Sequence, residues 1–210
     1  MIKTLLFDMG GVIFTQTTEK AFEAFRNAGI DTERVMGRHG QREFFLDLEM
    51  GRIGKEEFCR EMSKTVGREV SMEEAASCWQ AFYGGVKQEI LDALVELRKD
   101  YRIGLLSNTN PFMMDFTCSP DFSEAGKPIS DFFDDMYLSY ELKAYKPDAE
   151  IFEKVLEKGG LKPEETLFID DAMSNIEGAA KVGIQGLHVP TNEDWRGILA
   201  ERLRKEALNP

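Results

Sequence analysis

The sequence is short of cysteine and of positive charge. Its 210 residues include three cysteines, Cys59, Cys78 and Cys118, which are odd in number and lack Cys-x-x-Cys spacing. We therefore expect neither a disulfide framework nor a zinc site. Acidic residues outnumber basic residues by 38 to 26, which gives a formal net charge of −12. Because nucleic acids and anionic membranes are bound through positive charge, neither is an expected partner.

Long apolar runs are also lacking. No stretch approaches the roughly 18 apolar residues of a membrane-spanning helix, and the first residues lack the apolar core and cleavage site of a signal peptide. We therefore expect a cytoplasmic protein. With 42% hydrophobic and 30% charged residues, the composition is typical of a globular protein. The acidic balance repels anionic substrates, so a phosphorylated substrate would need a cation close to it.

The stretch from Leu5 to Phe14 carries one carboxylate, Asp8, followed by Gly10 and Gly11. Its apolar residues predict a strand that is covered on both faces. Ligands of open α/β sheets bind at the carboxyl edge, so Asp8 is predicted to stand in a crevice. An ionised carboxylate in a crevice must be paired, hydrogen-bonded or bound to a metal. The alternative interpretation is a structural Asp that caps a turn.

Three later apolar runs also lead into polar residues: Ser107 and Asn108 after 102–106, Lys146 after 136–139, and Asp170, Asp171 and Asn175 after 166–169. A parallel sheet would bring all of these groups to one edge. Taken singly, each has an ordinary explanation as a strand cap, a surface charge or a turn. Occurring together and in this order, they indicate a shared site.

The order of these groups resembles the four motifs of the haloacid dehalogenase-like (HAD) hydrolase superfamily, over residues 2 to about 190. The resemblance implies an α/β fold, with a Rossmann-like parallel sheet and helices on both faces. The core would comprise residues 1–14 and 86–210. It also implies a Mg²⁺-dependent phosphatase that acts on a small phosphorylated metabolite.

The same resemblance assigns roles to individual residues. Asp8 would be the nucleophile, while Lys146 and Ser107 neutralise and orient the phosphoryl group. Asn108 and Lys146 would contact the substrate. Mg²⁺ would be held by Asp8, Asp170, Asp171 and the backbone carbonyl of Gly10, and Asn175 would hold the acidic pair in place: all five assignments are carried over by motif match.

Residues 15–85 are helical in period and nearly free of strand signals. Glycines at 29, 51 and 67 and a capping box at Ser71 divide them into four helices. We predict a small all-helical cap, which in the resembled superfamily covers the site and selects substrates. The alternative is a rigid helical layer without a gating role. Arg38, His39 and Arg42 could reach an anionic substrate from this segment, but a surface loop is the favoured interpretation.

The core is predicted to resume with a helix over 87–99, and residues 111–131 are predicted to be irregular. The aromatic residues of that long loop could either contribute to the site or cover the core. Helices are expected after Asp148 and from Ser174, followed by a strand over 184–189 and a charged helix over 193–207.

One position departs from the resembled pattern. Most phosphatases of the superfamily carry a second Asp two residues after the nucleophile, where it protonates the leaving group and then activates water. Gly10 stands there instead. General acid–base catalysis is typically worth about 10²–10⁴-fold, so this loss need not abolish activity. Water, a cap residue such as Gln16 or Glu19, or a substrate hydroxyl could replace the acid.

Within the superfamily, the chain is most similar to the subgroup of bacterial α-D-glucose-1-phosphate phosphatases, at residues 106–110, 146–147 and 170–179 and around Glu49. A sugar phosphate is therefore the expected substrate, and an anomeric leaving group suits a site that is short of a general acid. One alternative is a catalytically impaired protein that only binds a phosphorylated ligand. A metal-free dehalogenase is the other, but it would have little use for two adjacent carboxylates.

Overall fold

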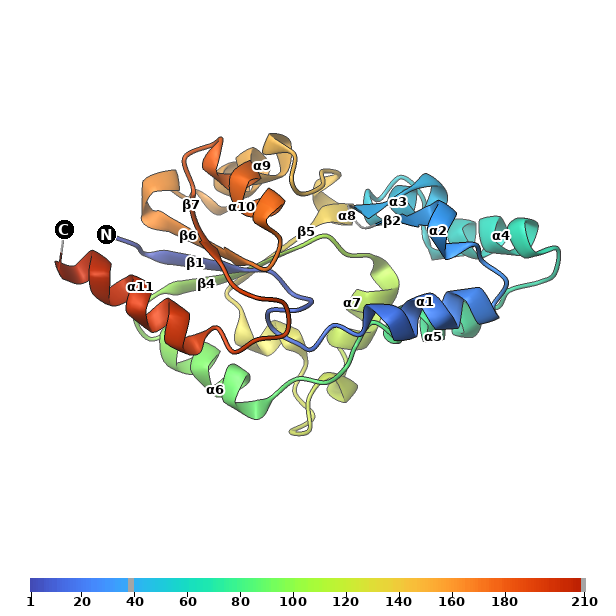
Figure 1. The fold of residues 1–210 in the computed structure, drawn as a ribbon, viewed down its shortest axis with the longest axis horizontal. Coiled ribbons are helices and arrows are strands. Elements are labelled where there is room, and N and C mark those ends of the chain that lie inside the picture. Colours follow the sequence, from blue (N-terminus) through green and yellow to red (C-terminus); the bar gives the residue numbers. More distant parts are fainter. Residues whose placement is uncertain (38–39, 209–210) are drawn as a thin grey trace.

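The fold, seen here in a computed structural model that describes residues 1–37 and 40–208, is built on a five-stranded sheet (Figure 1). Its strands are β1 (Thr4–Phe7), β4 (Arg102–Ser107), β5 (Asp135–Leu138), β6 (Thr166–Asp170) and β7 (Gln185–His188). They are all parallel and run in the order β5-β4-β1-β6-β7. The next strands of this sheet along the chain, β4 and β5, lie on one side of β1, and the last strands, β6 and β7, lie on the other side. Ligands of such sheets bind at this topological switch point next to β1.

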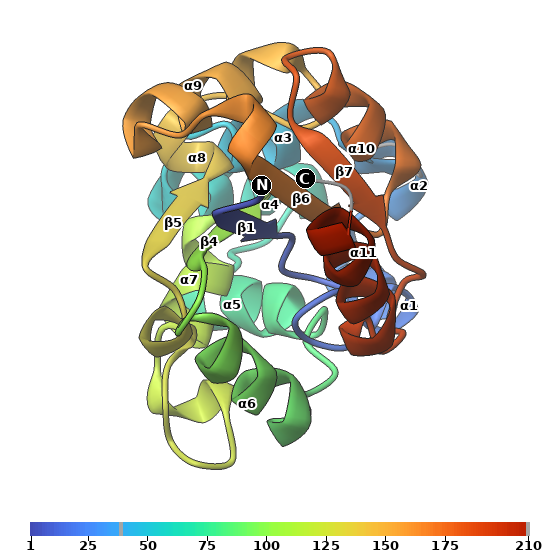
Figure 2. The same cartoon turned by 90° about the vertical axis from the view of Figure 1, so that its left-hand side faces the viewer.

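Both faces of the sheet are covered, as the apolar runs predicted. Leu5 and Phe7 of β1 pack in one apolar layer with α6 (Gln88–Leu97) and α11 (Arg196–Leu208), whereas Leu6 packs in the other with α9 (Ala149–Gly159) and α10 (Met173–Ala180). Figure 2 shows these two helical layers on opposite sides of the strands. The alternation follows from the two-residue period of a strand. The predicted Rossmann-like α/β fold is therefore confirmed.

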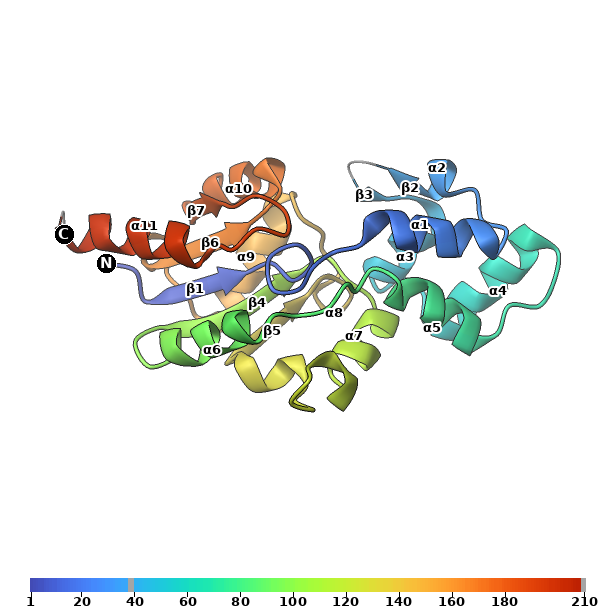
Figure 3. The same ribbon diagram turned by 60° about the horizontal axis from the view of Figure 1, so that its bottom comes forward.

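The segment after β1 forms a separate layer beyond the carboxyl edge of the sheet (Figure 3). It contains α1 (Thr18–Asn27), α2 (Thr32–Val35), α3 (Glu43–Glu49), α4 (Lys55–Val66) and α5 (Met72–Gln80). Four of these helices contribute one ring each to a buried cluster, Phe25, Phe45, Phe58 and Trp79. Neighbouring centroids lie 5.0 to 5.8 Å apart. Aromatic burial of this kind holds the layer together.

The prediction of an all-helical cap of four helices needs two corrections. The described part of the cap contains a fifth, four-residue helix, α2, and a pair of short strands, in which β2 (Met36–Gly37) pairs antiparallel with β3 (Gly40–Gln41). Two-residue strands are too short to show a period of two, so no sequence pattern indicated them. The predictions for Arg38 and His39 fall outside the described residues.

The segment predicted to be irregular begins with a helix, α7 (Pro111–Thr117), and contains 3-10 turns at Pro120–Phe122 and Ile129–Phe132. Asn110 caps α7, because its Oδ1 accepts from the backbone N–H groups of Phe112 at 3.0 Å and Met113 at 3.2 Å. Asn followed by Pro is a strong helix-start signal, and the sequence interpretation missed it.

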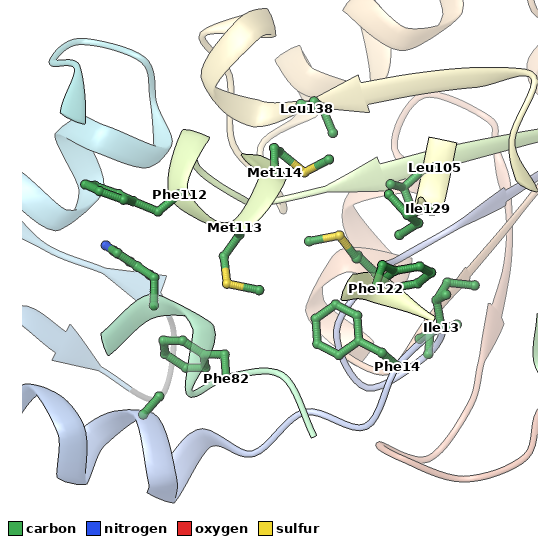
Figure 4. Close-up of a cluster of buried hydrophobic side chains, with 14 of the residues drawn as sticks. Ile13, Phe14, Phe82, Leu105, Phe112, Met113, Met114, Phe122, Ile129 and Leu138 are labelled. Atoms are coloured by element: carbon green, nitrogen blue, oxygen red, sulfur yellow. The ribbon is translucent and has the colours of Figure 1, made fainter. Parts of the chain in front are cut away.

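Helix α7 packs against both the cap and the core. Figure 4 shows Met113 and Met114 of this helix between Phe82, just after α5, and Leu138 of the sheet. The ring of Phe112 lies 5.7 Å from that of Phe58 in the cap. Among the described helices, none is long and apolar enough to cross a membrane.

Candidate active site

The carboxyl edge of the sheet gathers the predicted polar residues. Asp8 follows the last residue of β1, Ser107 ends β4 and Asp170 ends β6. β1 pairs with both β4 and β6, so these three residues leave neighbouring strands at the same edge. Lys146 reaches them from the connection between α8 (Ser139–Leu142) and α9.

Lys146 lies at the centre of this group. Its Nζ donates to Oδ1 of Asp8 at 2.6 Å, to Oδ2 of Asp170 at 2.8 Å and to the backbone oxygen of Leu106 at 3.1 Å. The Lys146 side chain is only 1% exposed. An ammonium group has three protons, and all three have acceptors here. The amine is therefore fixed between two carboxylates.

These contacts change the ionisation of the pair. Burial opposes the charge on Lys146, but Asp170 and Asp8 outweigh it and raise the pKa of this amine to about 12. Burial also raises the pKa of Asp8 to about 7; Lys146 opposes this shift, while Asp170 and Asp171 add to it. Three carboxylates and one amine leave the cluster with an excess of negative charge that calls for a further cation.

The arrangement suits a metal ion of the Mg²⁺ type. Asp8, Asp170 and Asp171 each offer a carboxylate oxygen, and these oxygens lie within 4.8 Å of one another. Mg²⁺ prefers such hard oxygen ligands and uses few of them. The donors present therefore fit the predicted cofactor. The predicted contribution of the Gly10 carbonyl remains a proposal.

Asn175, on α10, forms hydrogen bonds with the Asp170 carboxylate. Its Nδ2 donates to both carboxylate oxygens of Asp170 at 3.0 Å, and the backbone N–H of Ala172 donates to Oδ1 at 2.7 Å. Asp170 is fully buried. These contacts fix the orientation of the Asp170 carboxylate toward Lys146. The supporting role of Asn175 for the acidic pair stays a prediction.

Ser107 and Asn108 lie beside the lysine. Ser107 is 2% exposed, and both residues line the cavity in front of Asp8. The Asn108 side chain makes two hydrogen bonds with the Lys146 backbone, donating to its oxygen at 3.0 Å and accepting from its N–H at 2.9 Å. This amide positions the lysine; its predicted contact with a substrate remains a proposal.

The cavity in front of Asp8 has a volume of about 480 Å³ and is lined by both the core and the cap. Several lining residues were not predicted as functional: Gln41, Glu49 and Trp79 from the cap, and Thr109, Asn110 and Tyr145 from the core. The core residues lie next to the Ser107 and Lys146 motifs in the sequence, and this proximity could have indicated that they line the site. No sequence motif around Gln41 indicates a functional role, and Glu49 was named only as part of the subgroup resemblance.

The fold and the site together define the class of protein. This chain belongs to the haloacid dehalogenase-like hydrolases, whose family model matches residues 2–183. Among individual proteins, it is similar to the D-ribitol-5-phosphate phosphatase of Bacteroides thetaiotaomicron, with 41% identity over 197 residues that cover 93% of this chain and 96% of the relative.

Solved structures agree with this placement. A HAD-like family hydrolase from Porphyromonas gingivalis superimposes with a TM-score of 0.91 at 36% identity and covers 97% of this chain and 98% of its own. A HAD family enzyme of B. thetaiotaomicron, solved with magnesium and inorganic phosphate, has a TM-score of 0.84 at 35% identity, with 94% and 99% coverage. None of these relatives bears on the predicted glucose-1-phosphate phosphatase subgroup, which remains a prediction.

Proposed function

We propose that this chain is a Mg²⁺-dependent phosphatase that hydrolyses a small sugar phosphate or sugar-alcohol phosphate through an intermediate on Asp8. The observation that carries the proposal is the placement of Lys146 Nζ, 2.6 Å from Asp8 and 2.8 Å from Asp170. In this cluster the Asp8 carboxylate lies beside a fixed positive charge and two further acids, which supports nucleophilic attack by Asp8 and metal binding by the acids. The 41% identical phosphatase supports the assignment of the reaction.

In the first step, a carboxylate oxygen of Asp8 attacks phosphorus. The bond from phosphorus to the ester oxygen breaks, and the ester oxygen takes the bonding electron pair and a proton to leave as the alcohol. Water then attacks the phosphorus of the aspartyl phosphate, releasing inorganic phosphate and restoring the Asp8 carboxylate. Lys146 neutralises charge on the phosphoryl oxygens, and Ser107 orients them. Mg²⁺ held by Asp8, Asp170 and Asp171 would supply the remaining positive charge at the phosphoryl group.

The leaving oxygen needs a proton that Gly10 cannot provide. The substrate's own hydroxyl groups or water are the proton sources this proposal uses, and esters with an acidic leaving group should react fastest. The alternative of an impaired binding protein has no support in the site, where the nucleophile, lysine and acidic pair are all in place.

The test is a phosphate-release screen with and without Mg²⁺. It should include D-ribitol 5-phosphate, D-glucose 1-phosphate and simple alkyl phosphates, with Asp8→Asn as the blank. We expect release that needs both Mg²⁺ and Asp8. Tight binding of these esters with no release over hours would overturn the proposal in favour of a binding protein.

A further inference from the structure

Several described residues that line the cavity carry a buried polar side-chain atom without a hydrogen-bond partner. Among the residues that the structure describes, buried side-chain atoms without a hydrogen-bond partner occur on five residues, Gln41, Trp79, Thr109, Asn110 and Tyr137. All of these except Tyr137 line the cavity. More than about 90% of buried polar groups in proteins have a hydrogen-bond partner, and each group without one destabilises the fold. Such a concentration in one cavity indicates that a ligand completes these bonds.

The unpaired atoms lie on side chains that cannot easily turn away. Trp79, Thr109 and Asn110 are at most 2% exposed. The other end of the Asn110 amide is occupied by the N-terminus of α7, because its Oδ1 accepts two backbone N–H groups. The backbone N–H of Thr109 donates to Oγ of Ser139 at 2.9 Å. Burial therefore holds the side chains of Trp79, Thr109 and Asn110 in place before a ligand binds.

Glu49 adds a buried carboxylate to the same wall. It is the last residue of α3 and is 5% exposed, and the Tyr145 hydroxyl donates to its Oε2 at 2.6 Å. Ser139 Oγ donates to the backbone oxygen of Glu49 at 2.7 Å, which ties this point of the cap to the core. No basic side chain of the described residues forms an ion pair with Glu49. Burial raises the pKa of this carboxyl group to about 7, while Tyr145 and the nearby Asn110 amide oppose the shift.

The chemistry of this wall discriminates between substrate classes. Trp79 Nε1 and Asn110 Nδ2 donate, Gln41 Oε1 and Glu49 accept, and Thr109 Oγ1 does both. Hydroxyl groups, which both donate and accept, match this mixture. A purely aliphatic tail would leave the unpaired atoms of Gln41, Trp79, Thr109 and Asn110 without partners. Among the described residues that line the cavity, Lys146 is the only basic one, so these residues offer no further cation to a second anionic group.

We propose that Glu49, Thr109 and Asn110 form a hydroxyl-binding subsite that selects polyhydroxylated phosphate esters, in which Glu49 accepts a hydrogen bond from a substrate hydroxyl. This inference rests on the proposed phosphatase function and extends it to the part of the substrate away from phosphorus. A site built to bind hydroxyl groups rejects analogues that lack them, because its buried polar groups are then left unpaired.

The experiment compares D-ribitol 5-phosphate with n-pentyl phosphate, which has the same number of carbons and no hydroxyl, in the wild type, Glu49→Gln and Thr109→Val. The wild type should strongly prefer the ribitol ester. Glu49→Gln should lower the ratio of the two kcat/KM values at least tenfold, since it weakens a hydrogen bond to a charged acceptor, and Thr109→Val should lower it several-fold. Glu56→Gln makes the same chemical change as Glu49→Gln at an exposed cap position and should leave the ratio unchanged.

Each outcome decides the question. An unchanged ratio in both variants, or a wild type that hydrolyses n-pentyl phosphate as well as the ribitol ester, would overturn the subsite. An equal fall for both esters in a folded Glu49→Gln would assign that residue to structure or to general catalysis. Should Glu49→Gln fail to fold, Thr109→Val decides, because its hydroxyl has no partner in the protein. Failure of the proposed function differs from all of these: no ester at all would release phosphate in a Mg²⁺-dependent manner.

Discussion

A side chain added at Gly10 would place its first carbon 2.9 Å from Oε1 of Gln16. Gln16 lies on the chain that leads into the cap, where its backbone N–H donates to Oδ1 of Asn192 at 2.7 Å. The glutamine therefore fills the space into which the second Asp of related phosphatases would project. Because an amide does not exchange protons near neutral pH, Gln16 occupies this place without supplying the missing acid.

Introducing the acid with Gly10→Asp should raise turnover, most of all for esters with poor leaving groups. The backbone at Gly10 is not in the left-handed region. The three atoms nearest to the first carbon of the new side chain all belong to the flexible Gln16 side chain, so this carbon can be accommodated at low steric cost. We expect kcat for n-pentyl phosphate to rise, within the 10²–10⁴-fold typical of general acid–base catalysis, and kcat for D-glucose 1-phosphate to rise less.

The matched control is Gly10→Asn, which has the same shape and cannot transfer a proton. Removing the competing side chain in Gly10→Asp/Gln16→Ala should add to the gain. Equal or lower rates for all esters in Gly10→Asp would mean that proton transfer to the leaving group does not limit this enzyme.

Lys146→Met should damage both stability and activity. It leaves Asp8 and Asp170 without the amine that donates to them at 2.6 and 2.8 Å. Breaking a buried ion pair from one side typically costs about 3–5 kcal/mol. Mg²⁺ should raise the melting temperature of the variant more than that of the wild type, because the cation then neutralises carboxylates that have lost their amine. Thermal unfolding with and without Mg²⁺ measures both effects.

The control for this variant is Lys154→Met, which removes a partly exposed lysine that pairs with Glu150 on α9. Exposed pairs are worth about 0–1 kcal/mol, so little change is expected. A melting temperature for Lys146→Met no lower than that of Lys154→Met would contradict the view that the lysine neutralises the cluster.

The sheet could be predicted from sequence because its signals are local. Each buried strand shows as a continuous apolar run, and polar residues mark where it ends, as at Asp8, Ser107 and Asp170. The sequence interpretation missed helix α7, because it assigned Asn110 and Pro111 to a loop although Asn followed by Pro is a strong helix-start signal. β2 and β3 carry no periodic signal at all, since each is two residues long.

The site was predictable only in part, because its contacts join distant segments. Asp8 and Lys146 are 138 positions apart, and only the order of the motifs suggested that they meet. Glu49 and Tyr145 are 96 positions apart, and no motif connects them. A pattern along the chain indicates what a residue can do chemically, whereas the partner that buries or pairs it is set by tertiary packing. The proposed hydroxyl-binding subsite could therefore be inferred only from the structure.

Gly11 and Gly10 should respond differently to alanine. Gly11 has a φ of 82°, and a side-chain carbon there would lie 2.6 Å from Oδ2 of Asp171. Gly11→Ala should therefore lower stability by about 1–2 kcal/mol from backbone strain alone and displace a carboxylate of the proposed Mg²⁺ site. Gly10→Ala meets only the movable Gln16 side chain. We expect a weaker apparent Mg²⁺ affinity for Gly11→Ala than for Gly10→Ala in activity titrations, and similar values would refute the steric argument.

Glu49→Gln should change the pH dependence of stability. Burial raises the pKa of Glu49 from 4.5 to about 7 in the folded protein. Because the folded state then binds this proton more tightly than the unfolded chain, the contribution of Glu49 to stability falls as the pH rises from about 4.5 to 7, and it stays lost above that. Glutamine removes this effect, and its amide oxygen still accepts from Tyr145. At pH 8 the variant should therefore be more stable than the wild type, by up to about 3 kcal/mol.

At pH 5 most of that advantage should have disappeared. Thermal unfolding of both proteins without substrate, at unit steps from pH 5 to pH 8, gives the difference at each pH and cancels the other titrating groups. Glu56→Gln, at an exposed position of α4, serves as the control and should differ little from the wild type throughout. A Glu49→Gln advantage that is independent of pH, or that grows toward pH 5, would mean that the buried carboxylate does not carry this cost. A stability gain at pH 8 combined with poorer use of D-ribitol 5-phosphate would show that this carboxylate is retained for binding at the expense of the fold.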